Sequence, residues 1–291
     1  MEIKEDFSLK SYNTFGISIR AKSFSEFSSV DDLSEILEKF IDHQLMILGG
    51  VSNILLTKNF DGIVLKNNIP ASKVVNEDDE FMYVKAGAGV SWHQFVMYCV
   101  SSNFGGVENL SLIPGNVGAS PMQNIGAYGV EVKDIFYELT AWNIMENKIQ
   151  HFNNSDCEFG YRESVFKRKY KGQFIILDAT FRLDKNPAFN ISYGAISIEL
   201  EKMNIHALSI KAISDAVISI RQSKLPDPAV IGNAGSFFKN PEISSHELHE
   251  LTQIESNFPS YKRDEEKFKI PAGWLIEQCG WKGFREGDAG C

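Results

Sequence analysis

Residues 113–129 read IPGNVGASPMQNIGAYG, and they lie within the longest stretch of chain without a charged residue, Asn109 to Val130. That stretch is long enough to span a bilayer. Its prolines, glycines and asparagines would, however, leave backbone groups without hydrogen-bond partners in lipid. A long irregular segment inside a compact domain is usually functional. We therefore reject a membrane-spanning helix here and expect a ligand-binding loop.

Two shorter glycine-rich segments accompany this loop. Residues 49–53 (GGVSN) follow an apolar run, 45–48, that is typical of a strand, and residues 87–91 (GAGVS) follow an expected strand over 81–85. Glycine lets a backbone approach a ligand closely, and successive N–H groups can bind an anion such as a diphosphate. For 87–91 alone, a tight turn is the simpler interpretation. The chain contains no Rossmann fingerprint and no P-loop pattern, so neither fold is predicted.

The composition is that of a globular protein. The chain has 291 residues, enough for roughly two domains, with 43% apolar and 23% charged residues. Lys and Arg number 29 and Asp and Glu 38, which gives a net charge of −9. This sign disfavours nucleic-acid and anionic-membrane partners but permits a small anionic ligand. The four cysteines form no C-x-x-C pair and no apolar leader is visible, so we expect a reduced, cytoplasmic protein.

Hydrophobic periodicity and the positions of the prolines predict the remaining elements. Helices are expected over residues 31–42, 209–222, 243–256 and 271–279, with another opening near Ser91. Further strands are expected over 63–65, 174–177 and 179–183. The prolines of residues 225–228 predict a linker, because proline ends a helix. A third unit is expected to follow it.

Six segments of the chain are distinctive when taken in order: YNTFG (12–16), LGGVSN (48–53), residues 113–129, GYRES (160–164), GNAGSFFKNP (232–241) and AGWLI (272–276). Together they resemble the UDP-N-acetylenolpyruvoylglucosamine reductase (MurB) family. The resemblance implies an α+β protein with a PCMH-type FAD-binding fold of two α/β subdomains, residues 1–68 and 69–210, in which the FAD-binding region covers about 17–185. It also implies a third, α+β, substrate-binding domain over 211–291.

The resemblance further implies an activity. NADPH would reduce bound FAD, and the flavin would pass hydride to the enolpyruvyl group of UDP-N-acetylglucosamine enolpyruvate, which yields UDP-N-acetylmuramate for peptidoglycan precursors. The expected partner is thus a small UDP-sugar enolpyruvyl ether, and we expect a monomer. The residues that the resemblance places on FAD are Gly49, Gly50, Ser52, Asn53, Pro114, Gly115, Gly118, Ser120, Gly126 and Tyr128.

Two residues are implied in catalysis. Arg162 would hold the substrate carboxylate, since a guanidinium binds a carboxylate bidentately and keeps its charge. From the residues alone, an ion pair with Glu163 is the simpler interpretation. Ser236 would donate a proton to the enol carbon. Because a hydroxyl is a weak acid, this role needs a stabilised alkoxide or a proton relay, and Lys239 or Lys224 could supply cationic support. From the residues alone, Ser236 could equally be a turn hydroxyl bonded to backbone.

Four residues match substrate-contacting positions of the family: Tyr193, Lys224, Asn240 and Gln278. Tyr193 belongs to a segment that folds over the substrate diphosphate in the longer members. No metal site is expected. His246 and His249 are three residues apart on a predicted helix, but no acidic or cysteine partner has suitable spacing, so a solvated helix face is the better interpretation.

The chain departs from the family pattern at two places. Val51 stands where the family usually has a third glycine, and a β-branched residue would be strained there if the position needs a positive φ. Family members also continue past Cys291 with a tail that carries a catalytic Glu, so we expect this chain to bind flavin but to turn over slowly. Two alternatives stay open: a PCMH-type sugar or alcohol oxidase, and an inactive flavin-binding protein.

Overall fold

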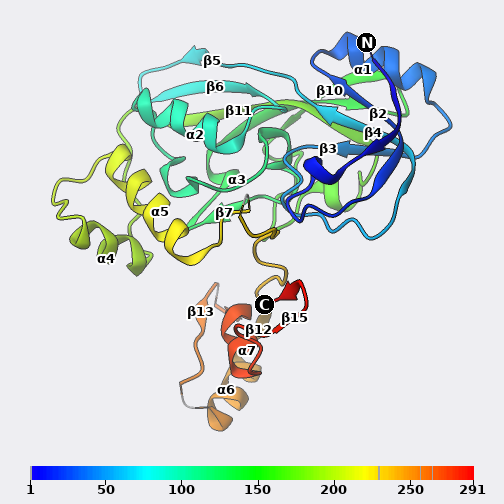
Figure 1. Ribbon diagram of the computed structural model, residues 1–291. Coiled ribbons are helices and arrows are strands. Elements are labelled where there is room, and N and C mark those ends of the chain that lie inside the picture. The colour runs from blue at the N-terminus through cyan, green and yellow to red at the C-terminus, as the bar shows by residue number, and fades with distance from the viewer. Residues whose placement is uncertain (1, 229, 256, 264) are drawn as a thin grey trace. The chain divides into compact units, whose positions relative to one another are not determined.

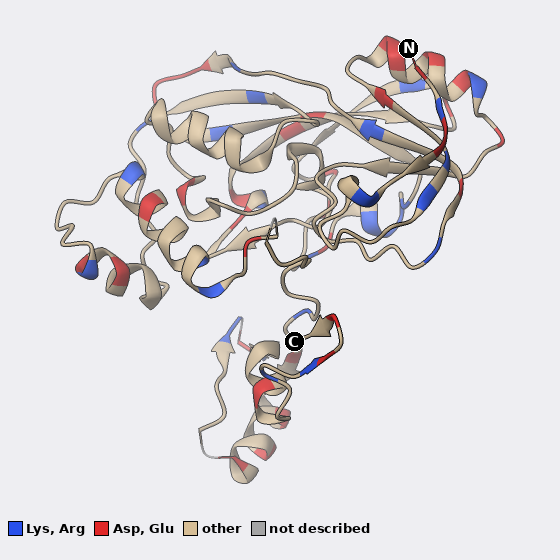
Figure 2. Ribbon diagram, in the orientation of Figure 1, with Lys and Arg blue, Asp and Glu red and all other residues tan. Residues whose placement is uncertain are grey.

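The chain divides into two compact units, Met1–Gly235 and Ser236–Cys291. The computed structural model describes residues 2–228, 230–255, 257–263 and 265–291, and it combines helices with both parallel and antiparallel sheets (Figure 1). The three-domain division expected from the sequence, with boundaries at 68 and 210, stays a prediction. Figure 2 shows that Lys and Arg are interspersed with Asp and Glu along the ribbon of each unit.

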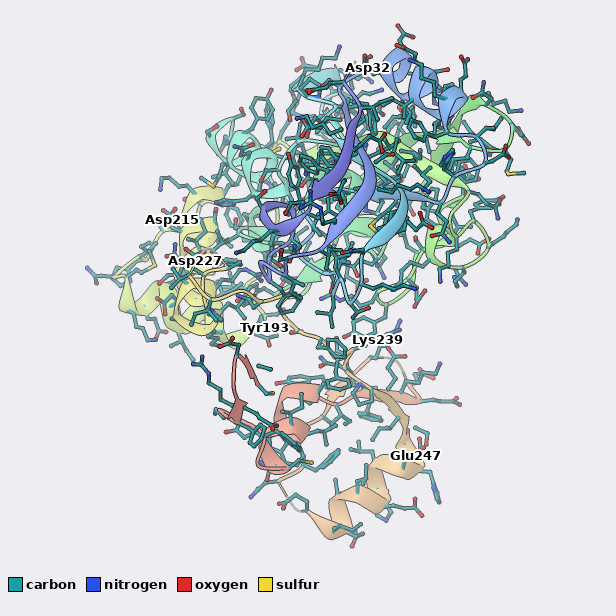
Figure 3. All side chains as sticks on the ribbon, turned by 45° about the vertical axis from the view of Figure 1, so that its right-hand side comes forward. Asp32, Tyr193, Asp215, Asp227, Lys239 and Glu247 are labelled. Carbon is teal, nitrogen blue, oxygen red and sulfur yellow. The ribbon has the colours of Figure 1, made fainter. Side chains whose placement is uncertain are left out.

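A four-stranded sheet opens the first unit. Its strands, in spatial order, are β1 (Lys4–Ser8), β2 (Arg20–Phe27), β4 (Phe60–Asn67) and β3 (Leu45–Leu48). Strands β2, β4 and β3 run parallel, and β1 is antiparallel to β2. Helix α1 (Val30–Lys39) connects β2 to β3 and begins at a capping box between Ser29 and Asp32, which Figure 3 labels. The short helix η1 (Lys10–Tyr12) lies between β1 and β2.

A five-stranded antiparallel sheet forms the second part of this unit. Its strands, in spatial order, are β10 (Lys148–Asn153), β9 (Phe136–Asn143), β11 (Phe174–Asp184), β6 (Phe81–Gly87) and β5 (Ser72–Glu77). Helix α2 (Trp92–Ser101) packs Trp92 and Phe95 against Phe181 of β11. The two sheets share a buried cluster, to which β4 contributes Ile63 and Leu65 and β11 contributes residues such as Leu177.

The charge-free stretch is irregular. With the residue on each side of it, it comprises the short helices η2 (Glu108–Leu110) and η3 (Val117–Ala119) and the hairpin of β7 (Gly126–Ala127) and β8 (Val130–Glu131). Helix α3 (Val132–Ile135) follows, and η4 (Val165–Lys167) lies between β10 and β11. Within the part of the chain that the structure describes, no helix is long and apolar enough to cross a membrane.

Two packed helices complete the first unit. Helix α4 (Gly194–Lys202) buries Ile196 and Leu200 against Ile213 and Val217 of α5 (Ile210–Lys224). Helix α5 ends directly before residues 225–228, as the prolines predicted. From the sequence, no residue range was assigned to α4, whose buried face has only Ile196 and Leu200.

The second unit is small and has few buried side chains. Its three-stranded antiparallel sheet has the order β12 (Glu242–Ser244), β14 (Lys267–Lys269) and β13 (Tyr261–Lys262). Helices α6 (Ser245–Ile254) and α7 (Ala272–Gln278) correspond to the two predicted helices, and β15 (Arg285–Glu286) pairs with β16 (Ala289–Gly290). A capping box joins Ser244 to Glu247, which is labelled in Figure 3, at the start of α6.

Candidate active site

The three glycine-rich segments meet at one place in the first unit, at the carboxyl ends of β3 and β6. Residues 49–53 leave β3 and lie against the loop that contains Gly115. A Cβ atom built on Gly50 would lie only 2.6 Å from the Cα of Gly115, so no side chain fits between the two loops. Gly115 has a φ of +112°, a conformation that glycine adopts without strain. The backbones of the two loops can therefore line the same site.

Residues 87–91 form the third side of this arrangement. The Nδ2 atom of Asn116 donates to the carbonyl of Gly89 at 2.5 Å, and the backbone N–H of Gly118 donates to the carbonyl of Ala88 at 3.0 Å. The sequence alone favoured a simple tight turn for 87–91. In the structure, this turn holds the loop of residues 113–129 in place.

The first loop presents unused hydrogen-bond donors. Within the described residues, four successive backbone N–H groups donate to no protein acceptor, those of Gly50, Val51, Ser52 and Asn53. The side chain of Asn53 donates to Gln123 Oε1 at 3.1 Å, which joins this loop to the longer one. Free N–H groups in succession attract an anion.

Val51 has the positive φ that would strain a β-branched residue at this place in the loop. Its φ is +48°, and its side chain is buried beside Leu48 and Leu56. The left-handed region costs an L-residue about 1–2 kcal/mol, and a β-branched residue is rare there. The backbone N–H of Thr14 donates to the carbonyl of Val51 at 3.4 Å. Neighbouring contacts thus hold Val51 in an unfavourable backbone geometry.

A cavity of about 620 Å³ opens beside this loop. The residues that line it come from the segment Ser11–Gly16, the loop residues Gly49–Val51, Lys66, and the stretch that contains Pro228, Val230 and Gly232. Two of the segments that carried the family resemblance, 12–16 and 48–53, therefore face one cavity. Its polar backbone and its size suit a nucleotide.

Several residues of the long loop serve its own structure. The hydroxyl of Ser120 is buried and donates to the carbonyl of Val117 at 2.8 Å, and a Cβ on Gly126 would lie 2.8 Å from the carbonyl oxygen of Val130. Pro114 is exposed next to Gly115. Any contact between Ser120 and a cofactor must therefore leave its bond to Val117 in place or replace it.

Arg162 is fixed to the long loop. Its Nη2 atom donates to the carbonyl of Gly126 at 2.7 Å, and the side chain of Asn124 donates to the carbonyl of Gly160 at 3.0 Å. The hydroxyl of Ser164 donates to the carbonyl of Met122 at 2.6 Å. Glu163, its neighbour in the chain, forms an ion pair with Lys167, with Oε1 and Nζ 3.9 Å apart.

A cluster that the sequence did not reveal surrounds the start and the end of the long loop. Arg221 of α5 donates from Nε to the carbonyl of Leu112 at 3.2 Å, and the N–H of Leu112 donates to Nδ1 of His93 at 3.1 Å. Burial lowers the pKa of Arg221, and a hydrogen bond to Tyr128 opposes that shift. The ring of Tyr128 packs edge-to-face on Tyr193, with centroids 5.4 Å apart.

The expected substrate residues of the first unit are exposed. Tyr193, labelled in Figure 3, lies at the N-terminal end of α4, and the residue is 46% exposed. Lys224 is the last residue of α5 and has no hydrogen-bond or ion-pair partner among the described residues. The structure therefore brings Tyr193 to Tyr128 and leaves Lys224 available to a ligand.

The remaining expected residues belong to the second unit. Ser236 is exposed, and its hydroxyl forms no hydrogen bond to any described residue, so it is not the turn hydroxyl that the residues alone permitted. Asn240 accepts a hydrogen bond at Oδ1 from the N–H of Ala272, at 2.9 Å, and so fixes the start of α7. Gln278 is exposed at the end of that helix. Its position leaves the side-chain amide available to a ligand.

No group of three or more His, Cys, Asp or Glu residues could hold a metal ion in the described ranges. His246 is exposed on α6, and its Nδ1 lies 3.7 Å from Oε2 of Glu250. This contact is that of a solvated helix face.

Comparisons with known proteins agree along the whole chain. Residues 22–152 match the model of an FAD binding domain, and residues 227–291 match the C-terminal domain of UDP-N-acetylenolpyruvoylglucosamine reductase. The chain is 50% identical to the UDP-N-acetylenolpyruvoylglucosamine reductase of Flavobacterium johnsoniae over 294 residues, which cover all of this chain and 86% of that protein. It is 49% identical to the reductase of Amoebophilus asiaticus, with the same coverage.

The fold also has a counterpart among solved structures. The crystal structure of the reductase from Thermus caldophilus superimposes with a TM-score of 0.65 at 21% identity, over 99% of this chain and 83% of that one. At 21% identity the comparison supports the fold alone. The first unit accordingly has the PCMH-type FAD-binding fold.

Proposed function

The chain belongs to the UDP-N-acetylenolpyruvoylglucosamine reductase family, and we propose that it reduces UDP-N-acetylglucosamine enolpyruvate to UDP-N-acetylmuramate with NADPH as reductant and FAD as the bound hydride carrier. This reaction belongs to peptidoglycan precursor synthesis. The monomeric state and the cytoplasmic location expected from the sequence stay predictions.

One observation supports the cofactor proposal most directly. Gly50 and Gly115 pack with their bare backbones together, and the loop whose free N–H groups run from Gly50 to Asn53 lines the cavity with Gly49, Gly50 and Val51. A dinucleotide carries a diphosphate, which such donors bind without a basic side chain. We propose that these groups, with Gly115 and Gly118 on the facing loop, hold the FAD. When bound, FAD supplies a carrier that accepts and releases hydride.

Arg162 and Ser236 would perform the acid–base and electrostatic work. The guanidinium of Arg162, held by Gly126, would keep the substrate carboxylate in place while negative charge develops next to it. Ser236, whose hydroxyl is free of protein partners in the described chain, would donate the proton to the enol carbon. Tyr193, Lys224, Asn240 and Gln278 are proposed to contact the UDP-sugar.

The proposal is tested with the purified protein. FAD should be released by acid, and oxidation of NADPH should require UDP-N-acetylglucosamine enolpyruvate. The matched control is UDP-N-acetylglucosamine, which lacks the enolpyruvyl group and should give no oxidation. A protein that binds no FAD would contradict the proposal. A flavoprotein that oxidises sugars or alcohols with oxygen, and ignores the enolpyruvyl ether, would support the oxidase alternative.

A further inference from the structure

Lys66 is a cation placed directly behind the first glycine-rich loop. It lies on β4 opposite Leu48, the last residue of β3 before the loop, and its Nζ atom donates to the carbonyl oxygen of Gly49. It is half-buried and lines the cavity of about 620 Å³ together with Gly49 and Gly50. Nothing in the sequence pattern pointed to this residue.

The charge of Lys66 is not neutralised by the protein. No carboxylate lies within ion-pair distance of its ammonium among the described residues. The acidic group that acts on it is Glu26, whose carboxylate already accepts from Tyr12 at 3.1 Å and from Asn68 at 2.9 Å. Burial lowers the pKa of Lys66, and Glu26 only opposes that shift. A half-buried cation without a partner is costly unless a ligand brings the opposite charge.

The bond to Gly49 also sets the direction of a loop donor. The carbonyl of Gly49 and the N–H of Gly50 belong to one planar peptide group and point in opposite directions. By holding that carbonyl, Lys66 fixes the orientation of the first of the four free N–H groups. Its charge also lowers the electrostatic potential energy of an anion in the same cavity.

We propose that Lys66 is a positioning residue for the diphosphate of the cofactor: it orients the Gly49–Gly50 peptide and supplies the positive charge that the loop otherwise lacks. This inference rests on the proposed function, because it assumes that the cavity receives the FAD diphosphate. It assigns Lys66 no part in proton or hydride transfer.

The test compares ligands with and without the diphosphate. The apoprotein is titrated with FAD and with riboflavin, and the dissociation constants are measured from flavin fluorescence. For K66M we expect the Kd for FAD to rise about 10- to 100-fold, since hydrogen bonds to charged groups are among the strong ones. The Kd for riboflavin should rise less than about threefold. The K58M variant removes a charge from the exposed Lys58 and should leave both constants unchanged.

Two further variants separate orientation from charge. K66Q keeps a donor for Gly49 but no charge, and K66R keeps both, so the Kd for FAD should increase in the order wild type, K66R, K66Q, K66M. If K66M does not fold, the dissociation constants of K66Q for FAD and riboflavin test the inference. An unchanged Kd for FAD in both K66M and K66Q would overturn the inference, as would equal losses for FAD and riboflavin. If the wild-type protein itself binds no FAD, the proposed function fails and this inference falls with it.

Discussion

Arg162 donates from Nη2 to the carbonyl oxygen of Gly126 at 2.7 Å, across 36 positions of sequence. The bond places a residue expected in catalysis on the loop expected to bind the cofactor. Arg162 has a φ of +57°, so its backbone is also held in an unusual conformation. Any movement of the 113–129 loop would therefore be transmitted to the guanidinium.

Replacing Arg162 by lysine should slow the enzyme although the charge is kept. Lysine cannot form the two parallel bonds that orient a carboxylate, and it meets the same backbone restriction as arginine. We expect the reoxidation of reduced flavin by the enolpyruvyl substrate to slow about 10- to 100-fold, with FAD content unchanged. Stopped-flow absorbance measures this rate. The R168K variant, at an exposed ion pair with Glu158, is the control. Wild-type kinetics in R162K would remove Arg162 from the site.

Substitution of Ser236 by alanine should separate the two half-reactions. Bleaching of the flavin by NADPH should be unaffected, because it requires no proton from this hydroxyl. The return of flavin absorbance on addition of substrate should slow by about 10²–10⁴-fold, the usual contribution of a general acid. Ser245 lies in the same unit, and S245A should leave both phases unchanged. Equal slowing of both phases in S236A would instead indicate a structural role.

Val51 allows a test of backbone strain in which the usual order of stability is reversed. At an ordinary buried position glycine is less stable than alanine, but at a φ of +48° only glycine escapes the steric penalty. We therefore expect V51G to be more stable than V51A by about 1 kcal/mol in denaturant unfolding of the apoprotein. Val64, buried in the same cluster on β4, should show the ordinary order, with V64A more stable than V64G. An ordinary order at both sites would mean that Val51 is unstrained.

His93 should make the stability of the protein depend on pH in the mildly acidic range. Burial lowers its pKa below the ordinary value of 6.5, and the neighbouring charge of Arg221 lowers it further. As the pH falls, His93 therefore takes up a proton at a higher pH in the unfolded chain than in the folded protein. The stabilising contribution of neutral His93 is present above about pH 6.5 and is lost as the pH falls toward the lower pKa of the folded state.

Asparagine at position 93 keeps an acceptor for the N–H of Leu112 but does not titrate. The stability advantage of the wild type over H93N should therefore shrink on acidification from pH 7.5 to pH 5, measured by denaturant unfolding at each pH. H151N, at an exposed imidazole, is the control. An advantage that stays constant or grows would show that His93 does not titrate as described.

Several helices and the glycine-rich loops could be predicted from the sequence, because these features depend on residues that are close together in the chain. Helical periodicity located α5 and α6, and prolines located the end of α5. The glycine-rich loops were found because glycine is needed where backbones come close, as Gly50 and Gly115 do. The sequence predicted that Val51 would be strained if its φ were positive, and the structure shows that the φ is positive.

What the sequence could not give depends on contacts between distant residues. Arg221 meets Leu112 across 109 positions, and Lys66 meets Gly49 only because β4 lies beside β3. No spacing rule predicts such neighbours. Asn240 shows the converse: a motif residue expected at the substrate also has a structural role, because its carbonyl oxygen caps α7. Residue type alone does not separate these two roles.

The contact between Gly50 and Gly115 has a consequence for how such a protein can evolve. A side chain cannot appear at Gly50 unless the second loop has already moved, since its first carbon would lie 2.6 Å from Gly115. The two positions are therefore constrained together, although Gly50 follows a strand of the four-stranded sheet and Gly115 follows a strand of the five-stranded sheet. A library that randomises residues 49–53 alone should return glycine at position 50. Gly16 differs, because a Cβ there would touch no protein atom within 4 Å and the backbone restriction is its φ of +63°.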